Sequence, residues 1–210
     1  MTQHIASLLL EASAVKLRVD EPFTLRSGIK SPIYCDNRLL ISDVPKRKEI
    51  IDAFVLALTG LDYDVIAGTA TAGIPWAAWV AGKLDKPLVY VRSEAKDHGK
   101  GARVEGRLEQ GTRVVLLEDL VTTGGSSISA VHALRDAGAS VTDVISIVTY
   151  ELASAKEAFA AAACNLTTLT TYTTLIDAAV AGSYITEDEK TIVAAWRDDP
   201  QNWQLVHGKI

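Results

Sequence analysis

The chain has 210 residues, of which 48% are hydrophobic and 22% charged, so it can bury one sizeable core within a single domain, residues 1–210. Its net charge of −5 argues against a general nucleic-acid-binding protein, because such proteins are usually basic. Two cysteines, no signal-peptide pattern and no apolar run long enough to span a bilayer predict a cytoplasmic protein without a membrane partner.

The N-terminal part predicts a helix followed by a hairpin. Apolar side chains recur at helical spacing over residues 2–17, and residues 23–25 and 33–36 alternate like two short strands. Ser27 and Gly28 supply a turn signal between those strands. On the residues alone this is a solvated hairpin face, and it carries the cations Arg26, Lys30 and Arg38.

The next part predicts two helices, 44–58 and 74–81, alternating with two buried strands, 63–67 and 87–91. Residues 68–75, which read Gly-Thr-Ala-Thr-Ala-Gly-Ile-Pro, join a strand to a helix with very small side chains. Such a loop lets backbone amides meet an anion directly.

A polar stretch, residues 92–101, follows the second of these strands. It has no apolar periodicity and contains glycines, so we expect a mobile loop. Loops of this kind are most often solvated surface, but this one holds the densest set of cations in an acidic chain, namely Arg92, Lys96, His98 and Lys100.

Residues 114–117 are an unbroken aliphatic run, typical of a strand buried on both faces of a parallel sheet. A turn at residues 110–111 predicts that this strand forms a hairpin with the segment around Val104. The run is followed by two carboxylates, then by a small hydroxyl-rich turn, residues 122–126, and then by a helical pattern. Free amides at a helix N-terminus attract anions, so the turn is predicted to cradle a phosphate.

The two carboxylates, Glu118 and Asp119, would repel a bare phosphate, and we therefore expect them to accept hydrogen bonds from hydroxyl groups. A ribose ring that carries a 5-phosphate offers both groups at a suitable separation. The sequence contains neither the Gly-Lys-[Ser/Thr] loop of nucleotide triphosphatases nor the Gly-x-Gly-x-x-Gly pattern of dinucleotide folds.

The C-terminal third predicts a strand at 141–148, a helix at 153–163, a β-rich stretch at 166–173 and a last helix at 187–196, which a capping box opens. Strands that alternate with helices in this way predict a doubly wound α/β fold, with a mainly parallel sheet flanked by helices. Ligands are expected at the carboxyl ends of its strands.

Residues 118–126 (Glu-Asp-Leu-Val-Thr-Thr-Gly-Gly-Ser) resemble the signature loop of the type I phosphoribosyltransferases, which bind phosphoribosyl pyrophosphate (PRPP). Residues 23–38 resemble the segment that forms the N-terminal hood over the base in orotate phosphoribosyltransferases, so we define the hood as residues 18–40. The Arg-x-x-x-Lys-x-His-Gly pattern that starts at Arg92 resembles their catalytic lid, here residues 92–106, which closes over PRPP from the neighbouring subunit of a homodimer.

The resemblance implies that orotate and PRPP react to give orotidine 5′-monophosphate and pyrophosphate. It implies Mg²⁺, held largely by substrate and water, with no direct side-chain ligand expected. The catalytic residues it implies are Lys96, His98 and Asp119. The PRPP-binding residues it implies are Arg92, Lys96, His98, Glu118, Asp119, Leu120, Val121, Thr122, Thr123, Gly124, Gly125 and Ser126, with Thr69 and Ala70 in the pyrophosphate loop. The orotate-binding residues it implies are Thr122, Arg26, Lys30, Tyr34 and Cys35.

Three positions depart from the family pattern. Arg26 and Ser93 stand where relatives often have lysine, and residues 149–152 stand where some relatives place an arginine that binds the orotate carboxylate. The hood then leaves Lys30 and Arg26 as candidates for that role. Two other readings stay open: a phosphoribosyltransferase for another nucleobase, and a PRPP-sensing regulator on the same fold. A regulator that binds nucleic acid should carry a basic face, which the net charge of −5 does not favour.

Overall fold

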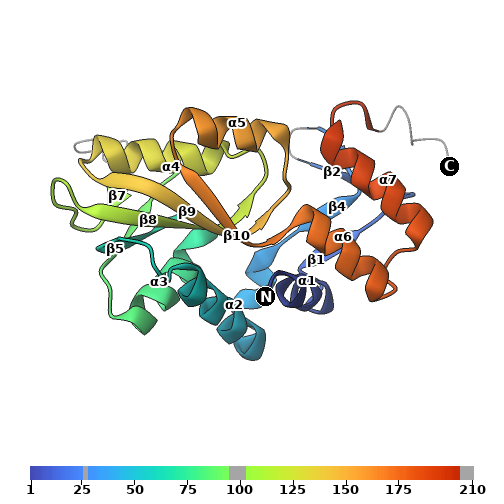
Figure 1. Cartoon of the computed structure of the whole chain (residues 1–210), viewed down its shortest axis with the longest axis horizontal. Helices are drawn as coiled ribbons and strands as arrows, with labels where there is room; N and C mark the ends of the chain where they lie inside the picture. Colours follow the sequence, from blue (N-terminus) through green and yellow to red (C-terminus); the bar gives the residue numbers. More distant parts are fainter. Residues whose placement is uncertain (26–27, 95–102, 204–210) are drawn as a thin grey trace.

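A computed structural model describes residues 1–25, 28–94 and 103–203 of the chain. A six-stranded sheet in the order β10-β9-β8-β5-β6-β7 forms its centre (Figure 1). Every neighbouring pair is parallel except β6 and β7, so the predicted doubly wound, mainly parallel α/β fold is confirmed. The strands are β5 (Val65–Thr69), β6 (Leu88–Val91), β7 (Val104–Glu105), β8 (Arg113–Val121), β9 (Ser140–Thr149) and β10 (Asn165–Thr171).

Helices cover both faces of this sheet. Figure 1 shows α4 and α5 over one face and α2 and α3 over the other. In β8, Val115 and Leu117 face the core under α2 and α3, whereas Val114 and Leu116 face the core under α4 and α5. An aliphatic run without polar alternation therefore fits this strand, because both of its faces are buried. The helices are α1 (Thr2–Glu11), α2 (Val44–Ala57), α3 (Gly73–Leu84), α4 (Gly125–Asp136) and α5 (Ala153–Ala161).

The N-terminal segment differs from the prediction in two ways. The first helix ends at Glu11, not at residue 17, and the chain then enters β1 (Val15–Leu17). The predicted pairing of 23–25 with 33–36 is wrong, because β1 takes β4 (Ile33–Cys35) as its partner. The strand β2 (Phe23–Thr24) pairs with β3 (Lys30–Ser31) instead.

The C-terminal helices α6 (Tyr172–Ala181) and α7 (Glu187–Asp198) complete the hood side of the molecule (Figure 1). The indole Nε1 of Trp196 in α7 donates to the carbonyl of Lys30 at 2.8 Å, which ties this helix to β3. The predicted capping box of Thr186 and Glu189 at the start of α7 is confirmed. The helix α6 begins inside the stretch that the sequence predicts as β-rich.

A second pairing was also predicted wrongly. The strand β7 joins β6 in an antiparallel ladder, Val91 opposite Val104, and does not pair with β8. The Arg92 amide donates to the carbonyl of Arg103 at 2.9 Å, so the two ends of the segment between them lie together. Within the described ranges, no helix has the length and apolar character that crossing a membrane requires.

Candidate functional site

The small-residue loop at 68–75 and the acidic pair lie side by side at the carboxyl ends of two adjacent strands. Gly68 of β5 is in register with Leu117 of β8, and Glu118 follows directly. A Cβ on Gly73, the first residue of α3, would lie 2.7 Å from the Leu117 carbonyl oxygen. A larger residue at Gly73 would push α3 away from the acidic pair, so this glycine keeps the two loops together.

The Glu118 carboxyl group is buried, with 4% of the residue exposed. One of its oxygens accepts from the Asp119 amide and the other accepts from the Ser127 hydroxyl, each at 3.1 Å. Burial, and then the neighbouring charge of Asp119, raise the pKa of Glu118. Burial also raises the pKa of Asp119. The pair therefore tends to hold a proton between its two carboxylates until a ligand or cation compensates them.

The predicted phosphate cradle turns into α4 at Gly124. This residue has φ +82°, a conformation that favours glycine, and a Cβ there would lie 3.2 Å from the Phe159 ring. As the N-cap of α4, Gly124 has no side chain to accept from the first-turn amides. No described side chain caps those amides, so they are available to an anion, and Thr122, Thr123 and Ser126 carry hydroxyl groups in the same stretch of chain.

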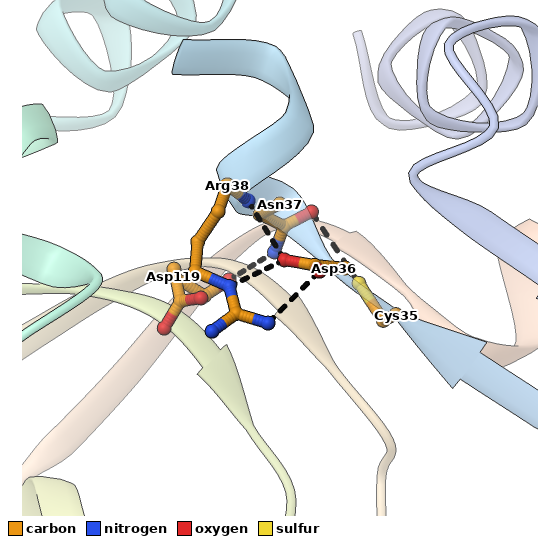
Figure 2. Close-up of polar contacts among 5 residues, drawn as sticks. All are labelled: Cys35, Asp36, Asn37, Arg38 and Asp119. Atoms are coloured by element: carbon orange, nitrogen blue, oxygen red, sulfur yellow. Dashed lines mark hydrogen bonds and ion pairs between the residues drawn. The ribbon is translucent and has the colours of Figure 1, made fainter.

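The hood reaches the acidic pair through the segment 35–38 (Figure 2). The side-chain amide of Asn37 donates to the backbone carbonyl of Asp119 at 2.8 Å, and its oxygen accepts from the Cys35 thiol at 3.3 Å. Burial raises the pKa of the Cys35 thiol, followed in size by the nearby charge of Asp119. Cys35 thus stays a neutral thiol, and its side chain is used within the protein rather than toward a ligand.

Arg38 starts the short 3₁₀ helix η1 (Asn37–Ile41) together with Asn37. Its Nε and Nη2 donate to the two carboxylate oxygens of Asp36 at 2.6 and 2.8 Å. That hydrogen-bonded pair lowers the pKa of Asp36. The sequence prediction included neither Asn37 nor Arg38 among the site residues, although the hood stretch contained both.

Two predicted hood residues, Lys30 and Tyr34, have described side-chain contacts within the hood itself. Lys30 donates from Nζ to the Thr24 hydroxyl at 2.7 Å across the β2–β3 pair. Tyr34 is 39% exposed, and its ring centroid is 5.5 Å from that of Phe23. Its exposed ring leaves a surface that a planar base can contact.

Thr69 and Ala70, the two predicted pyrophosphate-binding residues, lie at the start of the loop after β5. The Thr69 side chain is buried at the end of the strand, and its hydroxyl oxygen has no hydrogen-bond partner among the described residues. The Ala70 amide donates to the carbonyl of Val91 at 2.8 Å, so it is already used inside the sheet. The peptide between Ala70 and Thr71 is cis.

Of the predicted lid cations, Arg92 pairs with Glu105 at 3.8 Å. Lys96 and His98, together with Arg26 of the hood, lie outside the described residues. Among the residues with described positions, no group of three or more His, Cys, Asp or Glu side chains could hold a metal ion. The hard oxygen donors of the site are the two carboxylates at the end of β8, which suit Mg²⁺ only with further oxygens from substrate or water.

The sequence and the fold are similar to those of known proteins. A family model of the phosphoribosyl transferase domain matches residues 48–176. Orotate phosphoribosyltransferase of Coxiella burnetii is 50% identical over 202 residues, which cover 95% of this chain and 97% of that relative. The crystal structure of orotate phosphoribosyltransferase from Aeropyrum pernix has a TM-score of 0.75 and 34% identity, over 87% of this chain and 99% of that one. The Mycobacterium tuberculosis enzyme in complex with PRPP has a TM-score of 0.65 and 26% identity, over 83% and 98% of the two chains.

Proposed function

This chain belongs to the phosphoribosyltransferase family and, within it, to the orotate phosphoribosyltransferases, and on that premise we propose which residues carry the reaction. The enzyme transfers the phosphoribosyl group of PRPP to orotate and yields orotidine 5′-monophosphate and pyrophosphate, a step of pyrimidine biosynthesis. The observation that carries the assignment of the site is the acidic pair, with Glu118 buried and Asp119 half-buried, a short loop before a helix whose N-cap is Gly124.

The loop 122–126 binds the 5-phosphate of PRPP through the first-turn amides of α4 and the hydroxyls of the loop. Leu120 and Val121 bring the chain from the acidic pair into this loop. Glu118 and Asp119 accept hydrogen bonds from the ribose hydroxyls. Because the phosphate lies far from the reacting carbon, its binding energy positions C1′ rather than activating it.

At C1′ the bond to pyrophosphate breaks, N1 of orotate forms the new bond, and the N1 proton is released. The ring carbon gains positive character as the leaving group departs, as in glycosyl transfer generally. The carboxylate of Asp119 lies under the ring and stabilises that charge electrostatically. No side chain has to act as a nucleophile in this scheme.

Mg²⁺ fits a site with two carboxylates and many substrate oxygens, and when bound it neutralises charge on the pyrophosphate. The Glu118 and Asp119 carboxylates would help to balance its charge, and substrate and water oxygens would supply most of its ligands. The small residues 71–75 would face the pyrophosphate, because the Thr69 side chain is buried and the Ala70 amide is bonded to the Val91 carbonyl.

The lid, residues 92–106, brings Lys96 and His98 to the leaving pyrophosphate, and we place it over the active site of a second subunit in a homodimer. Support comes from its two ends, which the Arg92–Arg103 hydrogen bond holds together at the edge of the sheet. A loop that closes in this way would exclude water from the reacting carbon. We also propose that the enzyme is cytoplasmic, because its two cysteines fit a reducing compartment.

Orotate lies between the hood and the loop 122–126, with Thr122, Arg26 and Lys30 as polar partners. Tyr34 offers its exposed ring. Cys35 contributes through its backbone only, because its thiol is bonded to Asn37.

A direct assay tests the activity and the choice of base. The protein is incubated with PRPP, Mg²⁺ and one base at a time, and the release of pyrophosphate is followed for each base. We expect consumption of orotate only. Consumption of uracil or hypoxanthine without consumption of orotate would overturn the choice of substrate.

A further inference from the structure

The guanidinium group of Arg38 lies where the hood meets the acidic pair. Figure 2 shows it between the side chains of Asp36 and Asp119. Nε and Nη2 are held by the two oxygens of Asp36, whereas Nη1 makes no hydrogen bond to any residue whose position is described. The planar group is therefore fixed along one edge and free along the other.

This arrangement suits a second carboxylate. The planar guanidinium group of arginine has pairs of N–H donors whose geometry matches a carboxylate. A guanidinium group that one partner already holds loses less conformational freedom when it binds a second. The Asp36 side chain is 20% exposed and that of Arg38 is 63% exposed, so a ligand can reach the guanidinium group more easily than the Asp36 carboxylate.

Electrostatics place Arg38 between the two parts of the proposed nucleotide site. Its positive charge lowers the pKa of Asp119, against the larger effect of burial. Hydrogen bonding to Asp36 raises the pKa of Arg38 most, and the nearby charge of Asp119 raises it further. Tyr34, earlier in the same hood segment, also lies near the guanidinium group. Asp119 is proposed to bind the ribose, and Tyr34 is proposed to contact the base. A base that is bonded to the ribose has to lie between Asp119 and Tyr34.

Two of the predicted site cations already have described partners of their own. Lys30 bonds Thr24 within the hood, and Arg92 pairs with Glu105 at the edge of the sheet. The segment after β9 carries Glu151, whose carboxylate accepts from the amide and hydroxyl of Thr173 at 2.7 and 2.6 Å. This described side chain is therefore an acid bonded within the protein, and not a cation that could bind an anionic base.

We propose that Arg38 is a specificity-determining residue that binds the carboxylate of orotate through its free Nη1 edge, and that Asp36 is the positioning residue that orients the guanidinium. This inference rests on the proposed function, because it takes orotate as the base. It assigns to η1 the recognition of the orotate carboxylate, which neither the signature loop nor the lid supplies.

Orotidine 5′-monophosphate and uridine 5′-monophosphate test this directly, since they differ only in the carboxylate of the base. Without pyrophosphate neither reacts, so their dissociation constants can be measured by isothermal titration calorimetry. We expect Arg38→Gln to weaken the binding of orotidine monophosphate about tenfold or more, which is the usual effect of losing a charged hydrogen bond. The affinity for uridine monophosphate should stay nearly unchanged. Asp36→Asn should give a smaller loss that is also confined to orotidine monophosphate.

Two matched variants serve as comparisons. Lys48→Gln removes one positive charge from the exposed surface of α2 and should alter neither constant. Lys30→Gln tests the rival hood cation. If Arg38→Gln does not fold, Arg38→Lys keeps the charge without the fork and should still lose affinity for orotidine monophosphate alone.

An equal loss for both nucleotides, or no loss for either, would overturn the role of Arg38. So would a selective loss in Lys30→Gln but not in the Arg38 variants. If the unmodified protein binds neither nucleotide, the proposed function itself fails, and that result is distinct from the others.

Discussion

The side-chain amide of Asn37 donates a 2.8 Å hydrogen bond to the backbone carbonyl of Asp119, a residue 82 positions later in the chain. Asn37 is 1% exposed, and its second polar atom is satisfied by the Cys35 thiol. One buried amide thus joins the hood to the peptide of a proposed ribose-binding carboxylate. A shift of the hood would move that peptide with it.

Asn37→Ala should therefore reduce both stability and catalysis. The Asp119 carbonyl would be left buried without its donor, which costs about 1–3 kcal/mol of unfolding free energy. Because the Asp119 carboxylate would no longer be held in place, we expect kcat to fall about tenfold or more. Urea unfolding and steady-state kinetics measure the two effects. Ser42→Ala, which removes an exposed hydroxyl from the end of η1, is the control, and an unchanged kcat in Asn37→Ala would refute the positioning role.

Gly124→Ala should weaken PRPP binding. A Cβ at φ +82° is strained by about 1–2 kcal/mol, and it would also press on the Phe159 ring at 3.2 Å. Relief of that contact moves the loop 122–126, so KM for PRPP should rise.

Gly111→Ala separates the two causes. Gly111 has φ +79° with open space around its missing Cβ, so alanine there has the same backbone strain without touching the loop. Both variants should lose similar stability, but only Gly124→Ala should change KM. Equal KM values in the two variants would show that the cradle tolerates the extra methyl group.

The parts of this site that the sequence predicted are those with strong local chemistry. An aliphatic run marks β8, and its carboxylates and glycine-rich turn follow in adjacent positions. Gly124 is required by its own φ and by its contact with Phe159, and glycine is the sequence signal for such a turn.

The missed parts depend on distant residues. The bond from Asn37 to Asp119 has no signal in either local sequence. The strand β7 is two residues long, too short for a pattern that would choose β6 over β8. The start of α6 carries tyrosine and two threonines, which favour strands, but the Thr171 hydroxyl caps it by accepting from the Thr174 amide.

Lys96→Ala should lower turnover far more than PRPP affinity. Lys96 is proposed to stabilise charge that develops on the leaving pyrophosphate, and loss of one such donor typically costs about 10²–10³ in kcat. Single-turnover kinetics measure the chemical step, and calorimetry measures PRPP binding. Lys48→Ala, on the exposed side of α2, is the matched surface lysine. A Lys96 variant with near-normal turnover would remove this residue from the mechanism.

Glu118 should make stability depend on pH in the opposite sense to an ordinary paired carboxylate. Burial raises the pKa of Glu118 above its usual value of 4.5, so the folded protein keeps a proton that the unfolded chain has lost. Since the folded state binds more protons in this window, the free energy of unfolding falls as pH rises, by up to about 1.4 kcal/mol per pH unit. The window begins near the unfolded pKa and ends at the raised one.

Glu118→Gln keeps the shape of the side chain and cannot ionise, so it should remove most of that slope. Urea unfolding without ligand, between about pH 5 and pH 8, measures this slope. As pH rises, the free energy of unfolding of the variant should increase relative to that of the unmodified protein. A residual slope is expected from Asp119, whose pKa burial also raises. Glu109→Gln changes an exposed carboxylate that pairs with Arg107. Its curve of unfolding free energy against pH should run parallel to that of the unmodified protein. Parallel curves for Glu118→Gln as well would mean that this buried carboxyl is already ionised in the folded protein.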